Sequence, residues 1–403
     1  MYKLKRYTVH SVDVLVIIVI FVVIVLSIGK SDVFAAETLD NQTFTVDNIE
    51  YKIVSTDKVE IINYNREKKG EINFGAYVTY DGNTYTIVHI KNCLLEGCRE
   101  ITSVNLPDTI EYIGEGAFRN CTNLSALRLP NNKNLIVEYE AFSGCIDLLE
   151  ITLPEQLKNV QHHAFQNCTS LTTVRLNTIN CEAITERRGS DETIFKGCMK
   201  LEKVYIGEKV TVVPTGIFSG CTGLKKIVYE GDNVRKIGGA AFAGCKSLET
   251  LELPDSLTEI NPKAFMFCTS LKEVTIPENI KKLGYGIFGS CNNIETINFN
   301  AINCTSMGES GWAGYLYTFG GVSGISENMS GVKKLIIGEK VQRIPQYAFG
   351  GCPNLESINI PASVSSIQAN AFENLPKLLS IVVSGNNSIY TDHEGILDRK
   401  SVV

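Results

Sequence analysis

The stretch "PDSLTEINPKAFMFCTSLKEVTIP", residues 254–277, contains one full period of the sequence. Pro254 and Pro277 stand 23 residues apart, and each follows an apolar–polar–apolar triplet. Ala264-Phe265 lies between them, with Cys268 three residues after the phenylalanine. A fixed period of this length is typical of solenoids and other repeat folds. The number of times this period recurs therefore decides the fold.

The cysteine of this period recurs along most of the chain, usually at spacings of 23 or 24 residues. Two longer gaps precede Cys198 and Cys352. The segment "VKKLIIGEKVQRIP" (332–345) aligns with "LEKVYIGEKVTVVP" (201–214), which places Met329 in the cysteine position of a further unit. Leu375 occupies the same position one unit after Cys352. The pattern predicts about twelve units over residues 91–384. The cysteines in register are Cys98, Cys121, Cys145, Cys168, Cys198, Cys221, Cys245, Cys268, Cys291 and Cys352.

Each unit has apolar residues three, six, eight, twelve and fifteen positions after its cysteine. Positions six and eight are alternate residues, so they predict the inward side of one short strand, which a following proline ends. Ala-Phe-x-x-Cys is too short for a stable helix and predicts one helical or 3₁₀ turn. We expect an α/β, β-rich solenoid whose short parallel strands stack at about 4.8 Å.

The cysteine position predicts buried structural thiols. Met329 and Leu375 fill it in the same chain, so the position requires an apolar side chain, and free cysteine behaves as a small hydrophobe. A disulfide ladder is the alternative in an exported protein, although the total of 13 cysteines leaves at least one unpaired within the chain. No C-x-x-C motif is present, which argues against a metal site.

The unit C-x-x-L-x-x-(I/V)-x-(I/L)-P…A-F-x-x-C resembles the BspA-like leucine-rich repeats of bacterial and some protist surface proteins. Residues 37–90 are similar to that family's N-terminal β cap, and Asp81-Gly82 between alternating residues predicts a hairpin there. Residues 385–403 resemble the flank that often follows the repeats, and their abrupt end suggests a truncated chain. The resemblance implies a leucine-rich-repeat solenoid that serves extracellular adhesion or recognition.

The first residues predict export. Lys3, Lys5 and Arg6 precede an apolar run over 14–28, which is shorter than the ~20 residues of a membrane-spanning helix. This pattern indicates a signal peptide over 1–36, and the alternative is an uncleaved anchor that associates with the membrane through 14–28. Both interpretations make the rest of the chain secreted or displayed on the cell surface.

Composition and missing motifs exclude other classes. The net charge is −6 and no basic run stands out, which argues against nucleic acid as a partner. G-x-S-x-G, H-E-x-x-H and P-loop motifs are missing, so we expect no catalysis, no cofactor and no metal. The pair His162-His163 predicts a solvated turn.

Two regions are predicted to bind a ligand. Outward strand positions place Arg175, Lys203, Tyr205 and Lys226 in one basic and aromatic patch, and the alternative is an ordinary solvated strand face. Insertions near 178–194 and 301–328 begin with the matching segments "NTINC" and "NAINC". The second insertion predicts a binding loop, unless its aromatics pack back over the coil. Its aromatic residues are Trp312, Tyr315, Tyr317 and Phe319.

The sequence therefore favours a secreted or cell-surface adhesion protein that recognises an extracellular protein or carbohydrate on a host or neighbouring cell. Two alternatives stay open. In the first, the chain would be the non-catalytic targeting region of a larger exported enzyme. In the second, it would be a structural surface protein that self-associates through its strand face.

Overall fold

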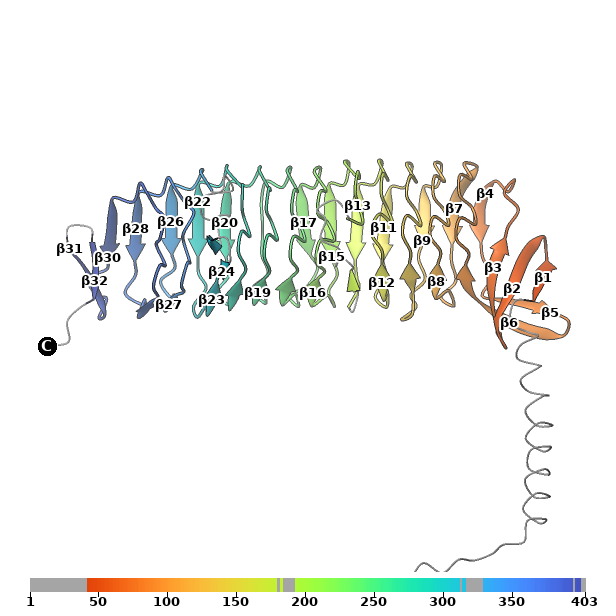
Figure 1. Ribbon diagram of the computed structural model, residues 1–403, viewed down its shortest axis with the longest axis horizontal. Helices are drawn as coiled ribbons and strands as arrows, with labels where there is room; N and C mark the ends of the chain where they lie inside the picture. Colours follow the sequence, from red (N-terminus) through yellow and green to blue (C-terminus); the bar gives the residue numbers. More distant parts are fainter. Residues whose placement is uncertain are drawn as a thin grey trace, which may run out of the picture.

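The computed structural model describes residues 42–179, 182–183, 193–311, 314–316, 329–393 and 396–399, and they form a long rod of stacked coils (Figure 1). The signal peptide predicted over 1–36 lies outside the described residues. Among those that are described, no helix has the length and apolar character needed to cross a bilayer. The predicted β-rich repeat solenoid is confirmed: one short parallel strand in almost every unit builds a main face along the rod.

The main face consists of parallel strands whose residues pair with the equivalent residues of the next unit. Lys203, for example, pairs with Thr173 on one side and with Lys226 on the other. The strands of this face are β4 Gly70–Asn73, β7 Ile101–Asn105, β9 Ala126–Arg128, β11 Glu150–Leu153, β13 Thr173–Leu176, β15 Lys203–Ile206, β17 Lys226–Tyr229, β20 Glu273–Ile276, β22 Thr296–Phe299, β26 Lys334–Ile337, β28 Ser357–Ile360 and β30 Ser380–Val383. The main sheet thus begins at β4, inside the segment 37–90.

The opposite face consists of two-residue strands, one for almost every unit, and these also pair in parallel. They are β8 Tyr112–Ile113, β10 Ile136–Val137, β12 Asn159–Val160, β14 Glu182–Ala183, β16 Val212–Val213, β18 Lys236–Ile237, β19 Glu259–Ile260, β21 Lys282–Leu283, β23 Ser306–Met307, β27 Arg343–Ile344 and β29 Ser366–Ile367. The apolar residue fifteen positions after the cysteine lies in these strands, as Val160 and Leu283 do, and the residue at position twelve precedes them and is also buried, as Leu157 and Ile280 are.

Breaks in the two faces are staggered along the rod. The main face is interrupted between β9 and β11, and again at 250–253, where the unit forms no strand. The opposite face is interrupted between β14 and β16 and between β23 and β27, where the two insertions leave the coil. At every break, pairing continues without interruption on the other face. The coils therefore stay in register along the whole described solenoid.

The N-terminal end is covered by a β-strand cap (Figure 1). Its strands are β1 Thr43–Val46, β2 Ile49–Ser55, β3 Lys58–Asn63, β5 Tyr77–Tyr80 and β6 Asn83–Ile90. The cap continues the sheet of the opposite face, because β6 pairs in parallel with β8. The predicted hairpin is confirmed, because β5 and β6 pair antiparallel around Asp81 and Gly82, both of which have positive φ. At the other end, β31 Tyr390–His393 and β32 Ile396–Arg399 form an antiparallel hairpin beside β30.

Phenylalanines of the Ala-Phe turns form a continuous stack inside the solenoid. Eight rings lie nearly parallel, with successive centroids 5.1 to 5.7 Å apart. All eight side chains are fully buried. Offset stacking of aromatic rings adds to the stabilisation that their burial provides. The stacked residues are Phe118, Phe142, Phe165, Phe195, Phe218, Phe242, Phe265 and Phe288.

The cysteine ladder is confirmed as a column of buried, free thiols. All twelve described cysteines are free, and all except Cys93 are buried; Cys181 lies outside the described residues. The thiols also form hydrogen bonds that the pattern did not predict. Most ladder thiols donate to a main-chain carbonyl of the preceding unit, as Cys145 Sγ does to Phe118 O at 3.3 Å and Cys268 Sγ to Phe242 O at 3.3 Å. A methionine or leucine in this position fills the space but cannot make this bond.

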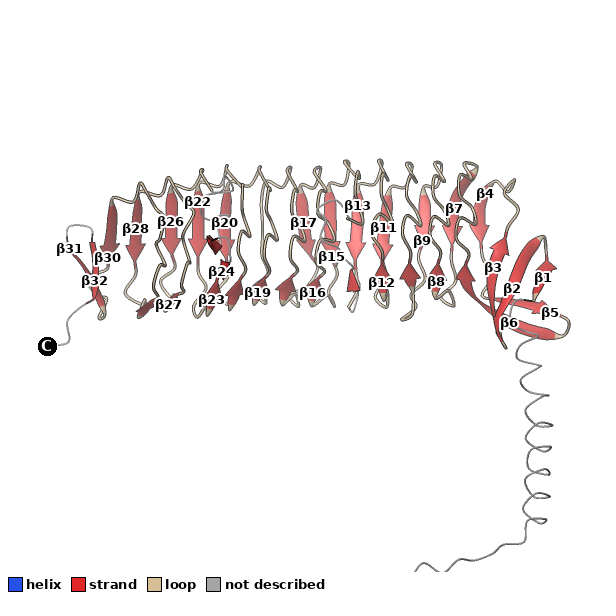
Figure 2. Cartoon of the chain, viewed as in Figure 1, coloured by secondary structure: helices blue, strands red, loops and turns tan. Residues whose placement is uncertain are grey.

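The predicted helical or 3₁₀ turn before each cysteine is instead a series of tight turns, and no described residue is helical (Figure 2). The hydrogen bonds do join residues three apart, as from Cys121 N to Phe118 O. Two residues per unit have positive φ, however, and these interrupt any helical run. In one unit they are Gly116 and Asn120. The sequence did not reveal them because glycine fills these positions in only some units.

Candidate functional site

Arg175, Tyr205 and Glu230 form the centre of the predicted basic patch on the main face. Arg175 lies on β13 with its guanidinium carbon 4.1 Å from the centroid of the Tyr205 ring on β15. Beyond the ring, Arg175 Nη1 forms an ion pair of 2.6 Å with Glu230 Oε1, just after β17. Three adjacent strands are thus joined through one arginine. Its charge is compensated within the protein, so Arg175 serves mainly to hold the tyrosine ring in place.

Lys203 and Lys226 lie beside this cluster without compensation. They are direct neighbours on β15 and β17, and both side chains are exposed. The Lys203 ammonium is 5.8 Å from the Tyr205 ring. Within the described part of the chain neither lysine forms an ion pair, whereas the adjacent Lys225 pairs with Glu202 at 2.9 Å. Like charges on neighbouring strands are unfavourable. The structure therefore brings the four predicted residues together, with two free cations at one side.

The aromatic loop is only partly described. Tyr315 lies on β25 Gly314–Leu316, which pairs antiparallel with β24 Glu309–Gly311. This hairpin follows β23 on the opposite face, so it is separated from the basic patch of the main face. Trp312, Tyr317 and Phe319 lie outside the described residues. The described part of this predicted binding region is therefore limited to the hairpin of β24 and β25.

Two clefts at the carboxyl ends of main-face strands were not predicted. Cleft 1 has a volume of about 610 Å³ and lies between the ends of β9 and β15. Cleft 2 has a volume of about 650 Å³ and lies between 251–255 and Asn300, beside the end of β20. Each adjoins one of the main-face breaks. The segment "IGEKV" occurs twice, at 206–210 and 337–341, and contains the glycine and lysine beside each cleft. This repetition was the sequence signal for the clefts, but in the sequence it served only to align the units.

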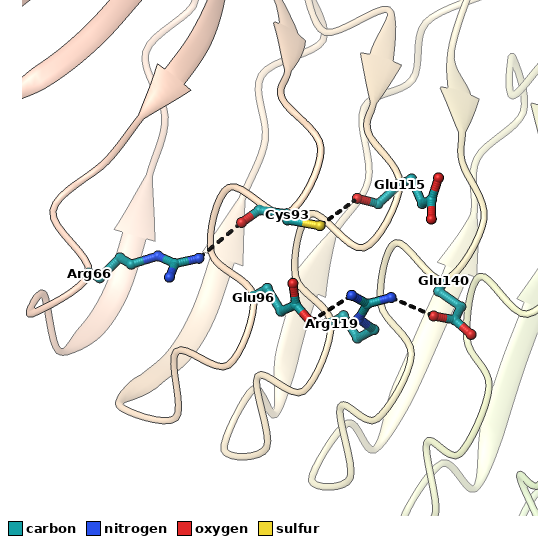
Figure 3. A network of polar contacts seen from close by, with 6 residues as sticks. All are labelled: Arg66, Cys93, Glu96, Glu115, Arg119 and Glu140. Atoms are coloured by element: carbon teal, nitrogen blue, oxygen red, sulfur yellow. Dashed lines mark hydrogen bonds and ion pairs between the residues drawn. The ribbon is translucent and has the colours of Figure 1, made fainter.

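A polar network ties the first units together at the N-terminal end (Figure 3). Arg119 pairs with Glu96 at 2.6 Å and with Glu140 at 2.7 Å, one unit to either side. These contacts raise the pKa of Arg119 and lower the pKa of Glu96. Cys93 lies nearby with its thiol 3.7 Å from Glu115 O, and burial raises the pKa of that thiol. The thiol is therefore not an activated nucleophile, and the network is structural.

Metal binding finds no support in the described residues, where no cluster of three or more histidine, cysteine, aspartate or glutamate side chains could hold an ion. His163 instead contacts Tyr139, with 3.3 Å between Nδ1 and the phenolic oxygen. The described surface thus offers charge, hydrogen-bonding groups and aromatic contact.

Comparison with known proteins identifies the repeat. A model of the BspA type leucine rich repeat region matches in six copies, over residues 84–187, 190–315 and 326–394, well over half of the chain. The comparison with curated proteins finds no match.

Solved structures show a similar fold. A leucine-rich repeat protein from Bacteroides ovatus is 23% identical, with 85% of this chain and 89% of that chain covered and a TM-score of 0.50. A leucine rich cell surface protein from Faecalibacterium prausnitzii is 21% identical, with 84% and 88% covered and a TM-score of 0.39. A leucine rich repeat protein from T. pallidum is 24% identical, with 51% and 91% covered and a TM-score of 0.40.

Proposed function

The chain belongs to the BspA type leucine rich repeat family, and from this premise we propose that it is a secreted or cell-surface binding protein without catalytic activity. The basic residues and apolar run before residue 37 support export. The repeat supplies a rigid scaffold, and function on such a scaffold depends on individual surface residues.

Lys203 and Lys226 carry this proposal. Two exposed, uncompensated ammonium groups on adjacent strands repel each other, and a ligand that bears negative charge relieves that repulsion. The Tyr205 ring, held by Arg175, offers a flat face beside them. We propose that an anionic group of an extracellular protein or carbohydrate, from a host or a neighbouring cell, binds here.

Replacing Lys203 and Lys226 together with alanine is expected to weaken binding of the anionic ligand about tenfold, since two exposed charge contacts each contribute ~1 kcal/mol or less. Residues 37–403 would be screened on arrays of matrix proteins and glycans, and affinities of the positive ligands measured at low and high salt. The wild-type protein should lose affinity with salt, and the double variant should lose much less.

Lys225→Ala is the matched control, because Lys225 is equally exposed but already paired with Glu202. It should bind as the wild type does. An absence of any extracellular ligand, or equal loss in the control and the double variant, would count against the proposal.

We also propose that Trp312, Tyr315, Tyr317 and Phe319 form a second contact surface. Replacing Trp312 and Tyr315 with alanine should lower ligand affinity and leave the unfolding midpoint unchanged, because exposed aromatic contacts contribute to binding and not to the core. Lost stability with unchanged binding would show instead that the aromatics pack against the coil.

A further inference from the structure

Clefts 1 and 2 are built from equivalent residues. Each spans consecutive units and has the same six lining groups: two leucines from the first unit, a threonine and a proline from the next, a glutamate after that proline, and an asparagine one unit later. In cleft 1 these are Leu127, Leu129, Thr152, Pro154, Glu155 and Asn177. In cleft 2 they are Leu251, Leu253, Thr275, Pro277, Glu278 and Asn300.

A recessed turn creates each cleft. The residue after the asparagine turns into the core in both copies, so that Thr178 is 2% exposed and Ala301 is 0% exposed. The turns on either side therefore meet above the recess. Lys209 Nζ lies 2.9 Å from Glu155 Oε2 across two units, and Lys340 Nζ lies 2.8 Å from Glu278 Oε1 in the second copy. The same lysine–glutamate bridge crosses both clefts.

Glycines in the following unit allow the asparagines to occupy these positions. A Cβ at Gly207 would overlap with Asn177 Oδ1, and a Cβ at Gly338 would overlap with Asn300 Oδ1. Each asparagine is half-buried. Within the described residues, neither carboxamide forms a hydrogen bond. Each cleft thus contains a carboxamide, with two donors and an acceptor, that is available to a ligand. A second asparagine lines each cleft, Asn131 in cleft 1 and Asn279 in cleft 2, but its side chain already forms a hydrogen bond with the main chain.

The shared lining carries no uncompensated charge, because each glutamate is paired with its lysine. Charge appears only where the copies differ. Arg128 in cleft 1 corresponds to Glu252 in cleft 2, and Asn131 corresponds to Asp255. Arg128 is itself paired with Asp108 at 2.9 Å. A ligand common to both clefts must therefore be recognised by the amide, the threonine and the apolar leucine and proline surfaces.

We propose that the two clefts bind the same neutral carbohydrate chain, with one sugar ring in each. A pyranose ring combines hydroxyl groups, which suit the asparagine and threonine, with an apolar C–H face, which suits leucine and proline. The volumes of both clefts lie within the range of small-ligand sites. This inference rests on the proposed extracellular binding function. It adds a second class of ligand, a neutral carbohydrate, and a second binding site, the two clefts.

The positions of the clefts suit a polymer. Both open at the carboxyl ends of main-face strands, cleft 1 beside the end of β11 and cleft 2 beside the end of β20. Five repeat steps separate Glu155 from Glu278, which corresponds to about 24 Å along the rod. A chain long enough to occupy both clefts gains affinity, because its second contact is intramolecular.

The test uses Asn177→Ala, Asn300→Ala and the double variant, probed with neutral oligosaccharides of increasing length on a glycan array and by titration in solution. The wild type should bind long chains more tightly than short ones. Each single variant should lose this advantage and keep binding of short chains at one site. The double variant should lose at least about tenfold in affinity for all of them.

Asn105→Ala, an exposed asparagine on β7, is the control and should bind as the wild type does. Circular dichroism and unfolding midpoints show whether each variant folds. The inference is overturned if no neutral glycan binds or if the double variant binds like the control. In that case, retained binding of anionic ligands through Lys203 and Lys226 would leave the proposed function standing.

Discussion

Raising the pH above about 9 is expected to unfold the solenoid within two to three pH units. Burial raises the pKa of Cys121 and Cys352 to about 12 and that of Cys145, Cys221 and Cys291 well above the ordinary value. In the unfolded chain these thiols ionise near the ordinary value of 9.0. The folded state keeps its protons while the unfolded state releases them, so stability is constant below pH 9 and falls as the pH rises toward 12.

The size of this effect follows from the number of thiols. Each contributes on the order of 1 kcal/mol per pH unit within that window. Several of them lie in one cooperative stretch of repeats, so the loss amounts to several kcal/mol per pH unit. A typical folded domain has only about 5–15 kcal/mol in total. Circular dichroism at constant ionic strength, with reductant present, measures the midpoint and the number of protons released.

Single cysteine variants provide the controls. Cys221→Ala should reduce the slope of stability against pH by about one proton, whatever its effect on stability at neutral pH. Cys93→Ser should change the slope less, because Cys93 is only partly buried. Stability that stays flat up to pH 11 would contradict the buried thiol column, and disulfides found in the folded protein would do the same.

Removing one ring from the middle of the phenylalanine stack is expected to cost about 3–5 kcal/mol. Phe218 is fully buried and stacks on Phe195 at 5.7 Å and on Phe242 at 5.5 Å. Phe218→Ala leaves a cavity and removes both ring contacts. Since repeat arrays are stabilised mainly by contacts between neighbours, the two halves should also unfold more independently. Urea unfolding should show a lower midpoint and a broader or two-step transition.

Phe218→Leu separates the two contributions, because leucine restores most of the volume without an aromatic ring. It should cost less than the alanine variant, and the difference between the two measures the cavity. A loss below about 1 kcal/mol for Phe218→Ala would show that the neighbouring coils collapse into the space and that the stack is not a principal source of stability.

Regularities that recur in every unit could be predicted from the sequence. Unit length, the inward strand positions and the buried thiols all appear many times. Exceptions were therefore informative, because Met329 in the cysteine position showed that this position requires an apolar side chain. The hairpin at Asp81-Gly82 was also predictable, because its turn chemistry is local. The prediction of a helical turn before each cysteine was wrong. The backbone there contains residues with positive φ, and the identities of these residues vary from unit to unit.

Features that depend on contacts between units could not be derived in the same way. The patch residues Arg175, Lys203, Tyr205 and Lys226 were placed on one face by counting positions along strands. Counting could not show that Glu230, beyond the end of its strand, compensates Arg175. Clefts 1 and 2 could not be predicted either. Each forms where the turn of one unit is recessed and the turns of the two adjacent units meet above it. The thiol hydrogen bonds likewise join most cysteine-containing units to a carbonyl of the unit before.

The staggered breaks have a mechanical consequence. If both faces lost strand pairing between the same two units, the rod could bend or separate at that point under tension. Here, wherever strand pairing is broken on one face, the strands of the same units remain hydrogen-bonded on the other face. Under shear, load passes around every weak point, and the rod should bend as a single stiff beam.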